Sequence, residues 1–135
     1  MANAMYPTFK ELLIGTGGVN LDTDTIKVAL VDTGTYTYSA AHDFYNDVSA
    51  GVVGTPQTIA NTTIASGVFD GDNVTFTSVT GNSVEALVIY KDTGNAATSN
   101  LVMYIDTGVT GLPVTPNGGN ITITWDNGAN KIFAL

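Results

Sequence analysis

Residues 81–135 read GNSVEALVIYKDTGNAATSNLVMYIDTGVTGLPVTPNGGNITITWDNGANKIFAL, and this stretch decides the fold. Its apolar segments are separated by Asp, Asn, Gly, Thr and Pro, the residues that favour turns. They predict strands at Val84–Lys91, Leu101–Asp106, Asn120–Trp125 and Lys131–Leu135. Short strands spaced by turn residues are typical of a mainly β protein, here an antiparallel β-sandwich with Ig-like or jelly-roll-like connections.

The strands differ in the burial that they predict. Residues 84–90 and 101–105 are almost continuously apolar, which indicates central strands with both faces covered. Residues 121–125 alternate strictly as Ile-Thr-Ile-Thr-Trp. One face of this strand should therefore be buried, and its Thr face should be open to solvent.

The amino-terminal part adds further elements. An apolar stripe after Pro7 predicts a short helix that ends near Gly15. Residues 25–31 predict a strand, and residues 40–48 predict a short helical turn or a structured loop. Residues 68–77 predict two short strands, or one strand that is broken in the middle.

The length of the chain fits a single domain over residues 1–135. Residues 1–8 are predicted to be an N-terminal arm. In residues 49–66, single apolar residues alternate with Gly, Pro, Ser and Thr, which predicts a loop or an extended arm, with an edge strand as a further interpretation. Both segments are candidates for arms that become ordered on binding a partner.

Charge excludes several classes of function. The net charge is −8, there is no Arg, and the only basic residues besides His42 are four scattered Lys. Phosphate backbones and anionic membrane surfaces need clustered cations, so we expect neither nucleic acid nor a membrane as partner. The start of the chain lacks the pattern of a signal peptide, and no apolar run approaches the ~20 residues of a membrane span. Charged residues are only 12% of the chain, which suits a subunit that assembles with copies of itself.

The triplet Asp-Thr-Gly occurs at residues 32–34, 92–94 and 106–108. Two copies follow apolar strands, as in aspartic proteases, where two such carboxylates share a proton. The alternative is a strand-ending turn, in which Asp bonds the backbone ahead and Gly takes a positive φ. Turns are favoured, because Tyr36 and Tyr104 depart from the protease pattern.

The other polar clusters also favour structural interpretations. Residues 70–73 and 22–24 place carboxylates together as a Ca²⁺ loop would, but neither is followed by the distant Glu of an EF-hand. His42 has Asp43 beside it and Ser39 nearby, yet sequence neighbours rarely form a triad, and a hydrogen-bonded loop His is favoured. We therefore predict no catalytic, cofactor-binding or metal-ligating residue.

The aromatic residues have two interpretations. They could stack on sugars or anchor a partner, and packing in the core or at an interface explains them equally well. The set is Trp125 with Tyr6, Tyr36, Tyr38, Tyr45, Tyr90 and Tyr104.

Two segments, Gly81-Asn-Ser-Val-Glu-Ala-Leu-Val-Ile-Tyr90 and Pro113-Val-Thr-Pro-Asn-Gly-Gly-Asn-Ile-Thr-Ile-Thr-Trp-Asp-Asn-Gly128, resemble a family of small structural proteins of tailed bacteriophages. The similarity extends to residues 26–34, to residues 38–43 and to the opening Met1-Ala-Asn-Ala. It covers most of the chain outside the region around residues 49–66.

The resemblance implies a virion component made in the host bacterial cytoplasm and located on the outer surface of the capsid. It implies a capsid decoration, or cement, protein whose partner is the major capsid protein of a phage head. A structural protein of the tail or baseplate is the alternative, and an aspartic-type protease is the enzymatic one.

Overall fold

The computed structural model describes residues 3–15 and 17–135 of the chain. It contains one α-helix, two 3-10 turns and ten strands among these residues. In chain order they are β1 (Ala4–Met5), α1 (Pro7–Ile14), β2 (Ile26–Val31), η1 (Tyr45–Asp47), η2 (Ser49–Gly51), β3 (Val52–Thr58), β4 (Thr63–Ala65), β5 (Val68–Asp70), β6 (Val74–Phe76), β7 (Ala86–Lys91), β8 (Leu101–Ile105), β9 (Ile121–Ile123) and β10 (Phe133–Ala134).

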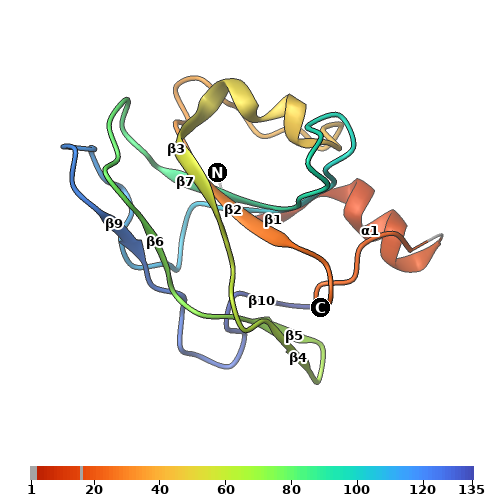
Figure 1. The fold of residues 1–135 in the computed structure, drawn as a ribbon. Coiled ribbons are helices and arrows are strands. Elements are labelled where there is room, and N and C mark those ends of the chain that lie inside the picture. The colour runs from red at the N-terminus through yellow and green to blue at the C-terminus, as the bar shows by residue number, and fades with distance from the viewer. Residues whose placement is uncertain (1–2, 16) are drawn as a thin grey trace.

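The strands form three antiparallel sheets that pack together as a β-sandwich. The largest has five strands in the order β1-β8-β7-β2-β3, and the others are β10-β5-β4 and the pair β6-β9. Both smaller sheets lie on one side of the five-stranded sheet, and the 3-10 turns lie on the other (Figure 1). The predicted fold class is confirmed.

The continuous apolar runs take the central positions that their pattern predicts. β7 lies between β2 and β8, with Val88 opposite Ala29 on one side and Tyr104 on the other. Its residues Leu87, Val88 and Ile89 are completely buried. A strand with neighbours on both edges and layers on both faces exposes no side chain to water. An unbroken apolar run therefore suits it.

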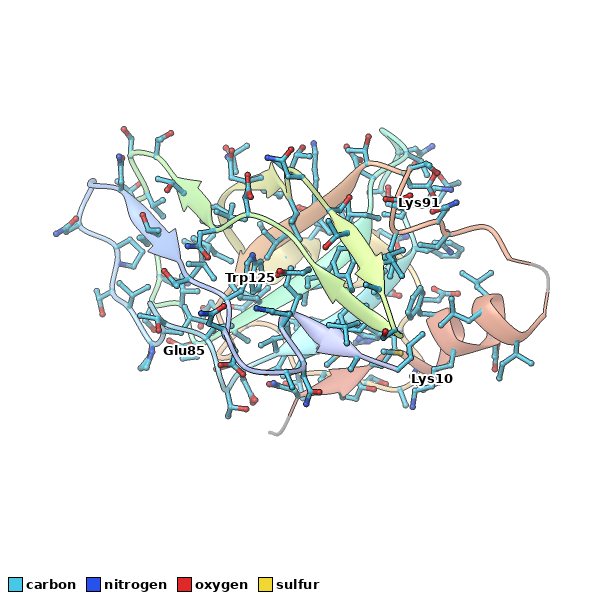
Figure 2. The ribbon with its side chains drawn as sticks, turned by 90° about the horizontal axis from the view of Figure 1, so that it is seen from below. Lys10, Glu85, Lys91 and Trp125 are labelled. Carbon is cyan, nitrogen blue, oxygen red and sulfur yellow. The ribbon has the colours of Figure 1, made fainter. Side chains whose placement is uncertain are left out.

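The alternating strand behaves as predicted. In β9, Ile121 and Ile123 are buried while Thr122 is exposed, and Trp125 beyond the strand is 5% exposed. Figure 2 shows the Trp125 side chain in the middle of the molecule, whereas Lys91 lies at its edge. β9 and β10 are shorter than the predicted strands at 120–125 and 131–135.

The helix, the strand at 25–31 and the helical turn are present, the last as the 3-10 turn η1. Pro7 occupies the first turn of α1, where a missing N–H costs no hydrogen bond, and Phe9 is its buried residue. Residues 68–77 form two strands, β5 and β6, which belong to different sheets.

The prediction of a loop or arm over residues 49–66 is wrong for much of its length. β3 pairs with β2, and β4 pairs with β5. Gly54 has a φ of 70° and Pro56 lacks an N–H, and these two residues hide the strand pattern. An edge strand tolerates both, so the edge-strand interpretation is the one observed for β3.

The predicted N-terminal arm is likewise built into the fold from residue 4 onward, first as β1 and then as the start of α1. β1 pairs with β8, Tyr6 is completely buried, and its N–H donates to the carbonyl of Val102 at 3.0 Å. Residues 1 and 2 of the predicted arm lie outside the described residues. Over the described ranges, no helix has the length and apolar character needed to cross a membrane.

Candidate functional site

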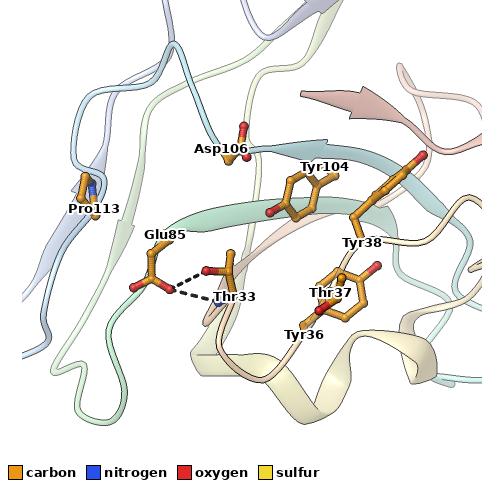
Figure 3. A pocket seen from close by; sticks show the side chains of 8 residues that line it. All are labelled: Thr33, Tyr36, Thr37, Tyr38, Glu85, Tyr104, Asp106 and Pro113. Atoms are coloured by element: carbon orange, nitrogen blue, oxygen red, sulfur yellow. Dashed lines mark hydrogen bonds between the residues drawn. The ribbon is translucent and has the colours of Figure 1, made fainter. Parts of the chain in front are cut away.

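The surface of the molecule contains a tyrosine-lined pocket of about 410 Å³. It lies where the segment after β2 meets the start of β7 and the end of β8 (Figure 3). Its walls are Thr33, Tyr36, Thr37, Tyr38, Glu85, Tyr104, Asp106 and Pro113. Aromatic walls with two carboxylates at the rim could hold a neutral or cationic polar group.

A chain of hydrogen bonds holds Tyr36, one of the residues that line the pocket. The Tyr36 hydroxyl lies 2.8 Å from the hydroxyl of Tyr6 and 2.9 Å from Nδ1 of His42. Burial raises the pKa of both Tyr6 and Tyr36 above the usual value of a phenol. Both phenols therefore remain protonated at neutral pH and act as fixed hydrogen-bonding groups.

The tyrosine rings pack against one another along one wall. Tyr38 lies 5.1 Å from Tyr6 and 5.5 Å from Tyr104, measured between ring centroids. Tyr104 is buried, and burial together with the nearby charges of Asp106 and Glu85 raises its pKa. Tyr38 is half-buried, so it is the ring of this cluster that offers most surface to a partner.

The first Asp-Thr-Gly segment forms a capped turn at the edge of this pocket. The Asp32 carboxylate accepts hydrogen bonds from the Gly34 N–H at 2.8 Å, the Thr35 hydroxyl at 2.9 Å and the Asn82 side-chain amide at 3.0 Å. The Gly34 N–H is the largest of the causes that lower the pKa of Asp32. An aspartic dyad would instead share a proton and hold one pKa up, so this carboxylate has the environment of a turn cap.

Glu85 secures the same turn from the other side. Its carboxylate accepts hydrogen bonds from both the N–H and the hydroxyl of Thr33, each at 3.0 Å (Figure 3). Two carboxylates thus accept hydrogen bonds from the turn after β2. The pocket that borders it is correspondingly well defined.

The other two Asp-Thr-Gly segments also follow strand ends. Asp92 accepts a hydrogen bond from the Gly94 N–H at 3.0 Å and pairs with Lys27 at 2.9 Å, and Lys27 lowers its pKa. After β8, the side-chain oxygen of Asn3 accepts the N–H groups of Asp106 and Thr107 at 2.7 and 3.0 Å. The strand-ending positions predicted for all three triplets are therefore observed.

The two acidic segments that resemble Ca²⁺ loops in sequence, residues 70–73 and 22–24, form hydrogen-bonded connections between secondary-structure elements. Asp72 accepts a hydrogen bond from the Asn61 amide at 2.6 Å, and Asn73 accepts one from the Trp125 N–H at 3.1 Å. Asp24 accepts the Asn20 N–H at 2.6 Å. Over residues 3–15 and 17–135, no three His, Cys, Asp or Glu side chains gather in a way that could hold a metal ion.

His42 and Trp125 are both held by hydrogen bonds. His42 bonds Tyr36, while the Ser39 hydroxyl accepts the N–H of Ala41 at 3.2 Å. The Trp125 indole donates to the carbonyl of Asp72 at 2.9 Å. The loop and core interpretations of these residues agree with this geometry, and a buried indole is not placed to stack on a sugar.

The sequence did not reveal that the tyrosines of this pocket line one hollow together with Glu85. They come from two segments, 36–38 and 104, that have no shared pattern. Only the pairing of β8 beside β7, and of β7 beside β2, brings them together. No protein-family model matches this chain, and no curated protein matches it either.

Proposed function

We propose that this protein is a structural component of a tailed-bacteriophage virion. Specifically, it is a decoration, or cement, protein that binds the outer surface of the head and stabilises the seams between subunits of the major capsid protein. The observation that carries the proposal is the resemblance of residues 26–34, 81–90 and 113–128 to small structural proteins of such phages. These residues include β2, most of β7, and β9, which belong to the framework of the sandwich.

The charge of the chain supports a position outside the shell. A protein with a net charge of −8, four Lys and no Arg is repelled by packaged nucleic acid. Binding to nucleic acid needs Lys or Arg side chains that neutralise phosphates and release their counterions. A protein on the outer surface does not have to approach that charge. Contact with the shell would then rest on apolar and main-chain groups over a broad area, with few ion pairs.

The ordered turns support a surface that binds without rearranging. Asp32 and Glu85 fix the turn after β2, and Asn3 fixes the turn after β8. These turns frame the tyrosine-lined pocket, where half-buried Tyr38 faces solvent. Preformed surfaces lose less conformational entropy on binding, which favours a tight, rigid joint between shell subunits.

Copy number tests the proposal. Quantitative mass spectrometry of purified virions that carry this protein should find hundreds of copies for each particle, since a decoration protein repeats over the head. Electron cryo-microscopy of the same particles should place the density on the outer head surface. A few copies per particle, or density in the tail or baseplate, would overturn the assignment to the head.

A binding experiment gives an independent check on the partner. Purified protein should bind empty shells of the major capsid protein and raise the temperature at which they disassemble, because ligands of the assembled state stabilise it by mass action. A chain that binds the shells without stabilising them would contradict the cementing role.

A further inference from the structure

Exposed apolar side chains gather on one face of the molecule, beside the three-stranded sheet. Leu13, Ile64 and Leu135 are 42%, 50% and 70% exposed, although large apolar side chains of the described chain are mostly buried. All three line a groove of about 280 Å³ whose floor includes Phe69 and Phe133. No charged side chain lines this groove among the residues that the structure describes. An apolar groove of this kind is typical of a surface that a partner covers.

The groove borders an open strand edge. β4 is the outer strand of the order β10-β5-β4, and all of its residues are exposed. The turn between β4 and β5 consists of Ser66 and Gly67, with φ of 52° and 77°, as in a two-residue hairpin. In such a hairpin the pair next to the turn is hydrogen-bonded and the following pair, Ile64 and Phe69, is not. The N–H and C=O of Ile64 therefore point away from β5, toward solvent.

Apart from its short length of three residues, this edge carries none of the features by which proteins block strand addition. At the edge of the large sheet, β3 carries Pro56, a positive φ at Gly54, and a register shift against β2. β4 reads Thr-Ile-Ala with neither proline nor charge, and residues 61–69 contain no charged residue. Natural proteins normally protect an exposed edge with lysine, proline or a bulge, so an unprotected edge marks a pairing site.

A row of apolar side chains crosses the three-stranded sheet and ends at the exposed strand β4. Phe133 lies opposite Phe69, and Phe69 lies opposite Ile64, so the three side chains cross the sheet on one face. Phe69 and Phe133 are 2% and 5% exposed, whereas Ile64 at the end of the row is half exposed. A further strand beside β4 would complete the row and bury Ile64.

We propose that the partner is a second copy of this chain, paired antiparallel along β4 about a two-fold axis at Ile64. In that arrangement each Ile64 donates its N–H to the other and accepts in return, and both side chains lie on the same face of the sheet. The two three-stranded sheets become one continuous sheet.

Two features of this face favour a copy of the chain over a different protein. A two-fold interface must carry both protruding and hollow parts on the same patch, and here exposed Leu135 and Ile64 stand beside the groove that they line. Two chains that each carry a net charge of −8 repel one another, and this face, whose lining has no charged side chain, is where side-chain repulsion between them is smallest. The pairing does not depend on the virion role proposed above.

The oligomeric state of the full chain tests the proposal. Sedimentation equilibrium in the high micromolar range should give the wild-type protein twice the 14.0 kDa mass of one chain. Ile64→Lys places two cations against each other at the axis and should leave a folded monomer, with folding checked by its circular dichroism spectrum. The matched control is Thr55→Lys, which makes the same charge change on exposed β3 and should remain a dimer.

A crosslink tests the position of the axis. The chain has no cysteine, so Ile64→Cys creates a single thiol. Residues in a hydrogen-bonded antiparallel pair have Cα atoms about 5.5 Å apart, inside the range of about 4.4–6.8 Å that a disulfide spans. Mild oxidation should therefore link Ile64→Cys chains into covalent dimers, while Thr55→Cys chains stay single.

Several outcomes would overturn the pairing. They are a monomeric wild-type protein, an Ile64→Lys variant that remains dimeric, and equal crosslinking of the two cysteine variants. A wild-type monomer whose binding to capsid shells is abolished by Ile64→Lys would assign the β4 edge to the shell protein instead.

Discussion

At the scale of single residues, Asp32 illustrates how a carboxylate can be committed to structure. It is 8% exposed, and it accepts three hydrogen bonds from Gly34, Thr35 and Asn82. Those donors favour the ionised form, so the pKa of Asp32 lies below its usual value of 3.8. A group whose pKa is lowered in the folded state stabilises that state above its unfolded pKa, and this contribution is lost as the pH falls toward the folded pKa.

Asp32→Asn should therefore destabilise the protein in a pH-dependent manner. Asparagine keeps one oxygen for the Gly34 N–H, but its amide group then faces the donors of Thr35 and Asn82. We expect a lower thermal midpoint at neutral pH, and a gap to the wild type that narrows as the pH falls below 3.8. Thermal unfolding between neutral pH and about pH 3 measures both effects.

The control for this prediction is Asp22→Asn. It makes the same change in net charge at an exposed side chain. Its thermal midpoint should stay close to that of the wild type, because exposed positions away from special contacts contribute little, within about 0.5 kcal/mol. A constant gap between wild type and Asp32→Asn across this pH range would show that the turn does not depend on the charge of Asp32.

At the scale of elements, β3 can be tested as an ordered strand against the alternative of an arm that is mobile in the free protein. Its end is tied to β2, since the Ile59 N–H donates to the carbonyl of Ile26 at 2.8 Å and Ile59 is 3% exposed. We expect the Ile59 amide to exchange slowly with deuterium in the free protein, because core strands open only with large free energies. The Tyr6 amide, bonded to Val102 in the N-terminal segment, should also be slow.

A comparison between β3 and the residue that follows it, Ile59, makes this prediction specific. Gly54 and Thr55 are exposed where the register against β2 shifts, so their amides should exchange faster than that of Ile59. Site-resolved exchange followed by NMR measures all of these amides. Uniformly fast exchange over residues 49–66 would instead indicate an arm that becomes ordered only on binding.

The elements that could be predicted from sequence are those whose pattern depends on their own burial. The runs at 84–90 and 101–105 are apolar because both faces are covered, and the Pro7 helix carries its start signal within its own first turn. β3 could not be predicted in the same way, since Gly54 and Pro56 interrupt its pattern and only the neighbouring β2 makes it a strand. β1 has two residues, too few to show any period.

The candidate site was less predictable than the fold for a related reason. The capped turn at Asp32 follows from local turn chemistry, which a triplet of residues contains. The pocket beside it depends on which strands are neighbours, and strand order is a property of the whole sheet. Burial of Tyr6, Tyr36 and Tyr104 agrees with the packing interpretation of the tyrosines, while the meeting of Tyr36 and Tyr104 in one pocket could be seen only in the structure.

At the scale of the whole molecule, aromatic contacts join the layers of the sandwich. Phe133 of β10 packs edge-on against Phe9 of α1, with ring centroids 6.4 Å apart, and lies 5.2 Å from Phe69 of β5. Trp125 joins the other small sheet to the β5–β6 connection through its bond to Asp72. The buried core includes residues from all three sheets. Such a core predicts that the layers unfold together.

Phe133→Ala tests whether the core acts as one cooperative unit. Removing a buried phenylalanine costs about 3–5 kcal/mol, against a total stability of about 5–15 kcal/mol for a typical domain. We expect the free energy of unfolding, measured by chemical denaturation, to fall by this amount, with unfolding still a single transition. Trp125 fluorescence should report the same midpoint as far-ultraviolet circular dichroism, although Trp125 follows β9, which belongs to a different sheet from β10. The control, Ala134→Ser at an exposed position of the same strand, should shift it by less than about 0.5 kcal/mol. If Phe133→Ala left the Trp125 transition in place and released only β10, the small sheets would have to be regarded as independently stable layers.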